Sequence, residues 1–233
     1  MSIAENLARV RARIAAAESA AGREPGSVRL LLATKTQPID LIRAAVEVDA
    51  AARATSAGTV HRVLLGENRV QELVAKAPDL TDLRAALHLI GPLQSNKVNA
   101  ALRWATCVQS VDTAELAERL DRRCAATDRT LDVMIQVNVS GEPTKSGVSP
   151  QDAARLTEQV DALDRLRLRG LMTIGANSPD QSLVRRGFAT LRELGERIGV
   201  SELSMGMSRD LELAVTEGAT IVRVGSAVFG ART

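Results

Sequence analysis

Apolar residues along the chain follow two alternating patterns. Short apolar runs that end at a polar residue are typical of buried strands, and the segments between them carry apolar residues at helical spacing. The chain opens with a helical pattern over residues 3–21, in which Ile3, Leu7, Val10 and Ile14 share one face. Further helical patterns cover residues 38–46, 150–163, 183–198 and 209–217. Apolar runs predict strands over residues 28–34, 63–65, 87–90, 107–111, 131–139, 168–174, 203–207 and 220–224.

Eightfold alternation of strand and helix, with no linker and no change in composition, predicts parallel strands joined by crossover helices. We therefore expect an α/β fold, a single (β/α)8 TIM-type barrel with an extra N-terminal helix, forming one domain over residues 1–233. An open doubly wound sheet is the alternative. That fold favours a glycine-rich phosphate turn after the first strand, where this chain has Thr34-Lys35-Thr36-Gln37-Pro38.

Polar residues stand where the predicted strands end, and in a barrel these ends form the reactive face. The residues that we expect to converge there are Lys35, Asn68, Asp112, Asn138, Ser208 and Arg223. Lys35 follows the first apolar run, where partial burial would favour a neutral amine that can attack a carbonyl group. The alternative is an ordinary lysine whose amine extends into water from the strand end.

Arg223 interrupts the last apolar run. Strand alternation directs it to the face opposite Val222 and Val224, into the barrel, where it needs either a buried carboxylate or a ligand atom as acceptor. Gly225 and Ser226 follow it, and residues 204–208 lead into a helix whose first amides predict a phosphate site. A lysine, an arginine and a phosphate site together suit an aldehyde that carries a phosphate, such as pyridoxal phosphate.

Composition narrows the function classes. Among 233 residues, 45% are hydrophobic, and 30 Lys and Arg face 28 Asp and Glu, which disfavours nucleic-acid binding. The two cysteines, Cys107 and Cys124, and the two histidines, His61 and His88, provide no credible metal cluster, and we expect the cysteines to be reduced and buried. Residues 1–6 lack a signal pattern and no apolar stretch suits a bilayer, so we expect a soluble cytoplasmic protein.

Several segments resemble the pyridoxal phosphate homeostasis proteins, relatives of the barrel domain of alanine racemases. They include LLATKT at residues 31–36, GENRVQE at 66–72, HLIGPLQSNK at 88–97 and LSMGMS at 203–208, with VRVGS at 222–226. The resemblance implies that Lys35 forms the internal aldimine with pyridoxal 5'-phosphate and that Arg223 faces the pyridine nitrogen. It also implies a ring neighbour, Asn68, and a phosphate end formed by Ser204, Met207, Ser208, Gly225 and Ser226.

The chain departs from the family pattern at two places. Residues 49–61 form an apparent insertion, which predicts a longer surface loop or helix extension near one rim of the site. Leu87 stands where the family commonly has an aromatic residue, before His88. We interpret His88 as a core histidine more readily than as a ring neighbour, and Lys97 and Lys145 as solvated loop lysines more readily than as groups that attract anions or donate cofactor.

The absence of tyrosine bears on catalysis. Racemisation needs an acid/base group on each face of the substrate, and alanine racemases take the second from a tyrosine of an additional domain across a dimer. We therefore expect a monomeric carrier, with no metal, no nucleic acid and no membrane as partner, that buffers pyridoxal phosphate or delivers it to apoenzymes in vitamin B6 and amino-acid homeostasis with little or no catalysis. The alternatives are a pyridoxal-phosphate-dependent amino-acid racemase, a Schiff-base aldolase, or a barrel in which Lys35 has no chemical role.

Overall fold

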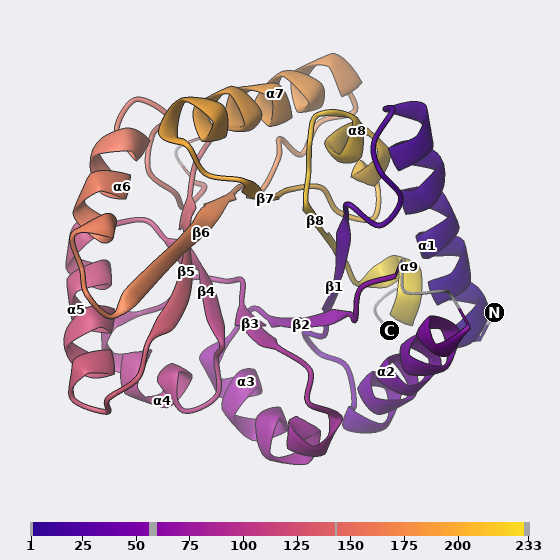
Figure 1. The fold of residues 1–233 in the computed structure, drawn as a ribbon, viewed down its shortest axis with the longest axis horizontal. Coiled ribbons are helices and arrows are strands. Elements are labelled where there is room, and N and C mark those ends of the chain that lie inside the picture. Colours follow the sequence, from indigo (N-terminus) through magenta and orange to yellow (C-terminus); the bar gives the residue numbers. More distant parts are fainter. Residues whose placement is uncertain (1, 56–59, 143, 231–233) are drawn as a thin grey trace.

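Eight parallel strands form a closed barrel in the computed structural model, which describes residues 2–55, 60–142 and 144–230 (Figure 1). Each strand pairs with the next, and β8 closes the barrel against β1, with Leu31 beside Arg223. The strands are β1 (Arg29–Ala33), β2 (Leu64–Glu67), β3 (Leu87–Leu89), β4 (Cys107–Val111), β5 (Leu131–Gln136), β6 (Leu166–Met172), β7 (Glu202–Ser204) and β8 (Ile221–Val224).

Helices surround the barrel and connect successive strands (Figure 1). They are α1 (Ile3–Ala20), α2 (Ile39–Ala54), α3 (Val70–Lys76), α4 (Val98–Leu102), α5 (Ala114–Ala125), α6 (Ala153–Asp161), α7 (Gln181–Ile198), α8 (Leu211–Thr216) and α9 (Ser226–Phe229), with 3-10 turns η1 (Ala77–Leu83) and η2 (Ser95–Lys97). Within the described part of the chain, no helix is long and apolar enough to cross a membrane.

Alternation along the strands separates two apolar layers. Leu30 and Leu32 of β1 face outward, into the large cluster between barrel and helices. Leu31 faces inward and belongs to the smaller cluster that fills the barrel. The other buried members of this inner cluster are Leu64, Ile90, Cys107, Met134, Met172 and Ile221. Arg223 follows Ile221 by two residues and therefore lies on the inner face, above this apolar floor.

Helix α1 precedes the barrel and packs on its outside. Ser2 and Glu5 form a capping box at its first turn, and the buried residues Leu7, Val10 and Ile14 face the core. The helix contacts α2, α8 and α9, and α9 lies between it and the barrel, near the closure of β8 against β1 (Figure 1).

The barrel and its extra N-terminal helix confirm the predicted fold class. The strand predicted over residues 203–207 ends at Ser204, because Gly206 adopts a φ of +85° that strands do not allow. Helix α2 extends to Ala54, eight residues beyond the predicted end at Val46, so the start of the apparent insertion is a helix extension. Residues 56–59 of that insertion lie outside the described residues. Both cysteines are free and buried, as predicted.

Candidate functional site

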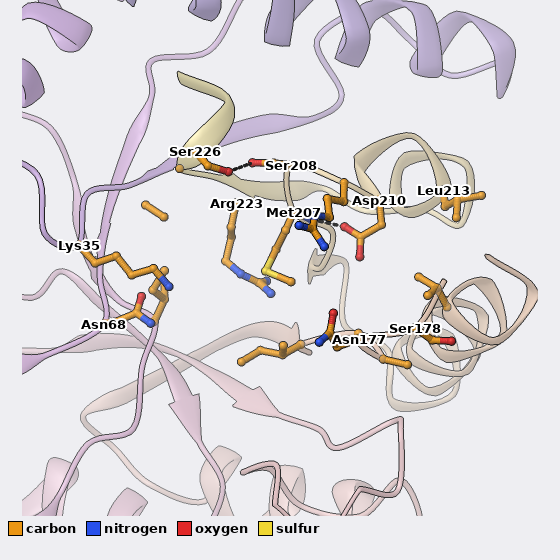
Figure 2. A pocket seen from close by; sticks show the side chains of 18 of the residues that line it. Lys35, Asn68, Asn177, Ser178, Met207, Ser208, Asp210, Leu213, Arg223 and Ser226 are labelled. Atoms are coloured by element: carbon orange, nitrogen blue, oxygen red, sulfur yellow. Dashed lines mark hydrogen bonds between the residues drawn. The ribbon is translucent and has the colours of Figure 1, made fainter. Parts of the chain in front are cut away.

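A cavity of about 820 Å³ opens at the carboxyl ends of the strands. All the expected cofactor-binding residues except Ser204 line it: Lys35, Asn68, Met207, Ser208, Arg223, Gly225 and Ser226. Figure 2 shows Lys35 and Asn68 together at one side, the guanidinium of Arg223 pointing into the middle, and the hydroxyls of Ser208 and Ser226 meeting above it. The strand ends of β1, β2, β7 and β8 therefore converge on one space.

Arg223 is buried but leaves one edge of its guanidinium open. Its Nη1 donates to the carbonyl oxygen of Ser204 at 2.7 Å and to the Ser204 hydroxyl at 2.8 Å, and its Nη2 donates to the carbonyl oxygen of Thr173 at 2.6 Å. A guanidinium has five N–H groups. The remaining N–H groups, one on Nε and one on Nη2, have no acceptor among the described residues, and the guanidinium points into the cavity (Figure 2).

The partners of Arg223 are neutral. Within the described residues no carboxylate contacts its guanidinium. Arg223 is therefore not held by a buried carboxylate, which was one of the two acceptors expected from the sequence. Burial lowers the pKa of Arg223 to about 10, opposed by the charge of Asp210, and the side chain remains cationic at neutral pH. A positive charge with an unused pair of donors is thus presented to the cavity.

Ser204 lies beneath the cavity instead of lining it, because its side chain points into the barrel interior. It is fully buried, and its hydroxyl donates to Oε1 of Gln109 at 2.7 Å while accepting from Arg223. Nε2 of Gln109 in turn lies 2.8 Å from Nδ1 of His88. Four strands, β3, β4, β7 and β8, contribute to this buried chain, which we call the arginine support. Sequence reasoning missed Gln109; its only signal is its inward position, two residues after Cys107.

His88 closes the arginine support at its far end, which agrees with the interpretation as a core histidine. The ring is 7% exposed, and burial, with a smaller effect from Arg29, lowers the pKa of His88 to about 3. The neutral ring accepts the Gln109 amide N–H at Nδ1. Each side chain of the arginine support therefore hydrogen-bonds to groups without a formal negative charge.

Lys35 lies in a tight turn that side chains of β2 and α3 stabilise. Thr36 has a φ of +62°, which is unfavourable for a β-branched residue, and its amide donates to Oε2 of Glu72 at 2.7 Å. Lys76 binds the same Glu72 oxygen at 3.0 Å, Oε1 of Glu67 at 2.8 Å and the carbonyl oxygen of Thr34 at 2.8 Å. This ion network fixes the backbone on both sides of Lys35 and stabilises the strained conformation.

Asn68 follows β2 and lies beside Lys35 (Figure 2). The end of β3 passes directly behind its backbone, so closely that a Cβ on Gly91 would collide with the carbonyl oxygen of Asn68. Ser110, on β4, donates to the carbonyl oxygen of Gly91 at 2.7 Å and fixes that approach. Gly91 thus has a positional reason to be glycine, and the GENR and HLIGP segments meet here.

The opposite end of the cavity is rich in unpaired donors. The Ser226 hydroxyl donates to the Ser208 hydroxyl at 3.4 Å, and the amides of Ser208, Arg209 and Ser226 have no acceptor among the described residues. A Cβ on Gly225 would lie 3.1 Å from the carbonyl oxygen of Ala33, so glycine lets the end of β8 approach β1. Hydroxyls and free amides grouped in this way suit an anion.

Some expected residues do not converge. Asp112 lines a separate, smaller cavity with residues of α5 and α6, and the Asn138 amide donates to the carbonyl oxygens of Glu142 and Lys145 within its own loop. Lys145 does line the main cavity, and it binds Glu142 at 2.6 Å and the carbonyl oxygen of Gly175 at 3.0 Å. Residues 174–179 and Asp210, also in the lining, carried no signal that the sequence reasoning used.

Comparisons with known proteins show the family to which this chain belongs. The family model described as "Alanine racemase, N-terminal domain" matches residues 3–233. A pyridoxal phosphate homeostasis protein of Pseudomonas aeruginosa is 45% identical over 233 residues, covering 99% of this chain and 96% of the relative. The chain belongs to the pyridoxal phosphate homeostasis protein family. This confirms the resemblance drawn from the sequence segments.

Solved structures of relatives share the architecture of this family member. PipY of Synechococcus elongatus, determined with pyridoxal phosphate bound, is 36% identical, with a TM-score of 0.82 over 98% of this chain and all of PipY. A protein of unknown function from Bifidobacterium adolescentis is 43% identical, with a TM-score of 0.86 over 97% of this chain and 94% of that one.

The apparent insertion predicted at residues 49–61 lies apart from the cavity as far as its residues are described. None of the described residues from 49 to 61 lines it, so the expectation that the insertion alters one rim of the site has no support among them. Asp49, the first residue of that segment, is fully buried and bound to arginines of α1 and α2.

Proposed function

We propose that this protein binds pyridoxal 5'-phosphate as a Schiff base on Lys35 and buffers or delivers it in vitamin B6 and amino-acid homeostasis, with little or no catalysis. The observation that carries the proposal is the open edge of Arg223, a buried cation with two unused donors, in the same cavity as Lys35 and the Ser208–Ser226 pair. A ligand that satisfies all three has an aldehyde, a ring acceptor and a phosphate.

The donors fit each part of that molecule. Ser208, Ser226 and the neighbouring free amides suit the phosphate, and the edge of Arg223 suits an unprotonated ring nitrogen, which can only accept. The amine of Lys35 suits the aldehyde carbon, since amine and aldehyde condense to an imine with loss of water. When bound, the cofactor supplies an electrophilic carbon that captures amines.

Arg223 also bears on the choice between carrier and enzyme. Its guanidinium donates a hydrogen bond and so disfavours a proton on the ring nitrogen, which weakens the cofactor as an electron sink. Lys35 can supply an acid/base group on one face, and the chain has no tyrosine to supply the other. These two features favour a reversible anchor over a racemase or an aldolase. We also propose that the protein is a monomer and that its partners are the apoenzymes to which it passes the cofactor.

The test is a titration of purified protein with pyridoxal phosphate, followed by the visible absorbance of the imine before and after borohydride. We expect wild type and Lys97→Ala, a lysine outside the cavity, to develop the band, and Lys35→Ala to lack it. A wild-type protein that takes up no added cofactor would reject the proposal. Incubation of the coloured protein with single amino-acid enantiomers tests the carrier: loss of optical purity at enzymatic rates would favour a racemase instead.

A further inference from the structure

Helix α1 forms hydrogen bonds, from outside the barrel, to the two segments that carry Ser208 and Ser226; we call their end of the cavity the phosphate-facing end. Arg13 forms a two-pronged ion pair with Glu212 of α8, with Nε to Oε1 at 2.6 Å and Nη2 to Oε2 at 2.8 Å. The same Nη2 donates to the backbone carbonyl of Ser208 at 3.0 Å. Seven residues before Arg13 on this helix, the buried side chain of Asn6 donates to the carbonyl oxygen of Val228 in α9 at 2.9 Å. Both walls that carry the cavity serines are thus attached to one helix.

The Arg13 contact fixes the direction of one peptide group. The described chain has no cis peptide, and in a planar trans peptide the carbonyl and the following N–H point in opposite directions. Because the Ser208 carbonyl points to α1, the Arg209 amide points away from α1, to the side on which Ser208 and Arg209 line the cavity. That amide is one of the donors without an acceptor among the described residues.

We propose that Arg13 is a positioning residue for the phosphate: by holding the Ser208 carbonyl outward, it presents the Arg209 amide and the Ser208 hydroxyl to the anion. The inference rests on the proposed function, because it takes pyridoxal phosphate as the ligand. It assigns to the extra N-terminal helix a role in affinity for the phosphate group, although no residue of α1 lines the cavity.

A second ion pair of the same build provides a matched control. Arg43 of α2 binds Asp82 through Nη1 at 2.8 Å and Nη2 at 2.6 Å, and Nη1 also donates to the carbonyl oxygen of Asp79 at 2.7 Å. The arginine side chains are 30% exposed in Arg13 and 32% in Arg43. Arg43→Ala therefore removes a similar set of bonds without touching the phosphate-facing end.

The experiment compares the affinity of each variant for pyridoxal phosphate and for pyridoxal, which has the aldehyde but no phosphate. We expect Arg13→Ala to weaken pyridoxal phosphate binding roughly tenfold, about the effect of one well-placed hydrogen bond, and to leave pyridoxal binding within twofold of wild type. Arg43→Ala should change neither affinity, although it should shift the melting temperature by about as much as Arg13→Ala does. Phosphorus NMR of the bound cofactor should show a changed phosphate resonance in Arg13→Ala only.

Glu212→Gln separates positioning from simple charge attraction. If Arg13 acted only through its distant charge, removal of the neighbouring carboxylate would strengthen binding of the phosphate dianion. Positioning predicts weaker binding, because the guanidinium loses its second anchor. The inference is overturned if Arg13→Ala weakens both ligands equally or neither, or if Glu212→Gln tightens pyridoxal phosphate. A wild-type protein that binds neither aldehyde would instead overturn the proposed function.

Discussion

Two buried charges in this molecule are handled in opposite ways. Asp49, between α1 and α2, accepts from Arg11, Arg53 and the amide of Val63, so its charge is met by two cations. Arg223, inside the barrel, is held by two carbonyl groups and a hydroxyl, all neutral. The charge of Asp49 is neutralised by opposite charges within the fold, whereas Arg223 keeps its charge and a pair of donors.

This difference gives a criterion for distinguishing a buried charge with a structural role from one with a functional role. A charge paired with opposite charges has its desolvation cost offset within the fold. A charge held by dipoles alone is oriented but not neutralised, so the rest of its interaction is left for a ligand. By this criterion we interpret Asp49 as a structural link between α1 and α2, and Arg223 as a candidate ligand-binding residue.

Asp49→Ala should damage stability and spare binding. The substitution leaves Arg11 and Arg53 facing each other and the Val63 amide unpaired, and we expect a loss of about 3 kcal/mol in the free energy of unfolding. Urea denaturation measures that loss. Under conditions in which the variant is folded, its affinity for pyridoxal phosphate should equal that of wild type; a loss of affinity beyond threefold would show that the two clusters are coupled.

Arg223→Lys should do the reverse. An ammonium keeps the charge but cannot hold its neutral acceptors and also present a flat pair of donors to the cavity, so we expect pyridoxal phosphate to bind roughly thirtyfold more weakly, about 2 kcal/mol. The absorbance titration measures this change. Unchanged affinity in a folded variant would mean that the open edge of Arg223 does not meet the ligand.

His88 makes the arginine support sensitive to acid. Its folded pKa of about 3 lies below the unfolded value of 6.5, so the unfolded state binds the proton first. The stability from a neutral His88 is fully present above pH 6.5 and declines as the pH falls towards 3, with a loss of about 2 kcal/mol between pH 6.5 and 5. His88→Gln should flatten this part of the curve. Parallel curves for wild type and His88→Gln would refute a neutral buried His88.

Ser204→Ala should give the smallest effect. It removes one hydroxyl that links Gln109 to Arg223 but keeps the carbonyl that binds the same Nη1, so we expect a loss of about 1 kcal/mol in stability and roughly threefold in cofactor affinity. Ser201→Ala, at an exposed position before β7, is the control. If Ser204→Ala weakened binding as much as Arg223→Lys, Ser204 would have to touch the ligand directly.

Much of the fold was predictable, because it depends on local patterns. Apolar runs and helical spacing identified the strands, and alternation around Arg223 placed its side chain inside the barrel. The closeness of Lys35, Arg223 and Ser226 followed from the rule that strand ends meet at one face. Asp112 and Asn138 also follow predicted strands, but neither lines the main cavity, since a residue just past a strand can turn into its own loop.

The rest depends on register and distant packing, which a single sequence does not encode locally. Gln109 stands in an apolar run, and its meeting with Ser204, 95 positions away, requires the barrel to close with a particular stagger. Arg13 looks like a surface helix residue until α1 is placed against α8, which brings it to Ser208, 195 positions away. Asp49 read as part of a surface insertion, and only the packing of α1 on α2 shows that it is buried.

The role proposed for Lys35 is tested by locating the residue to which the cofactor becomes attached. The chain has four lysines, at positions 35, 76, 97 and 145, so borohydride reduction of the cofactor-loaded protein, digestion and mass spectrometry can assign the adduct to one of them. We expect the reduced adduct on Lys35, and we expect it to disappear in Lys35→Ala. An adduct mainly on Lys76, Lys97 or Lys145, or none on a protein that has bound the cofactor, would contradict the proposed role.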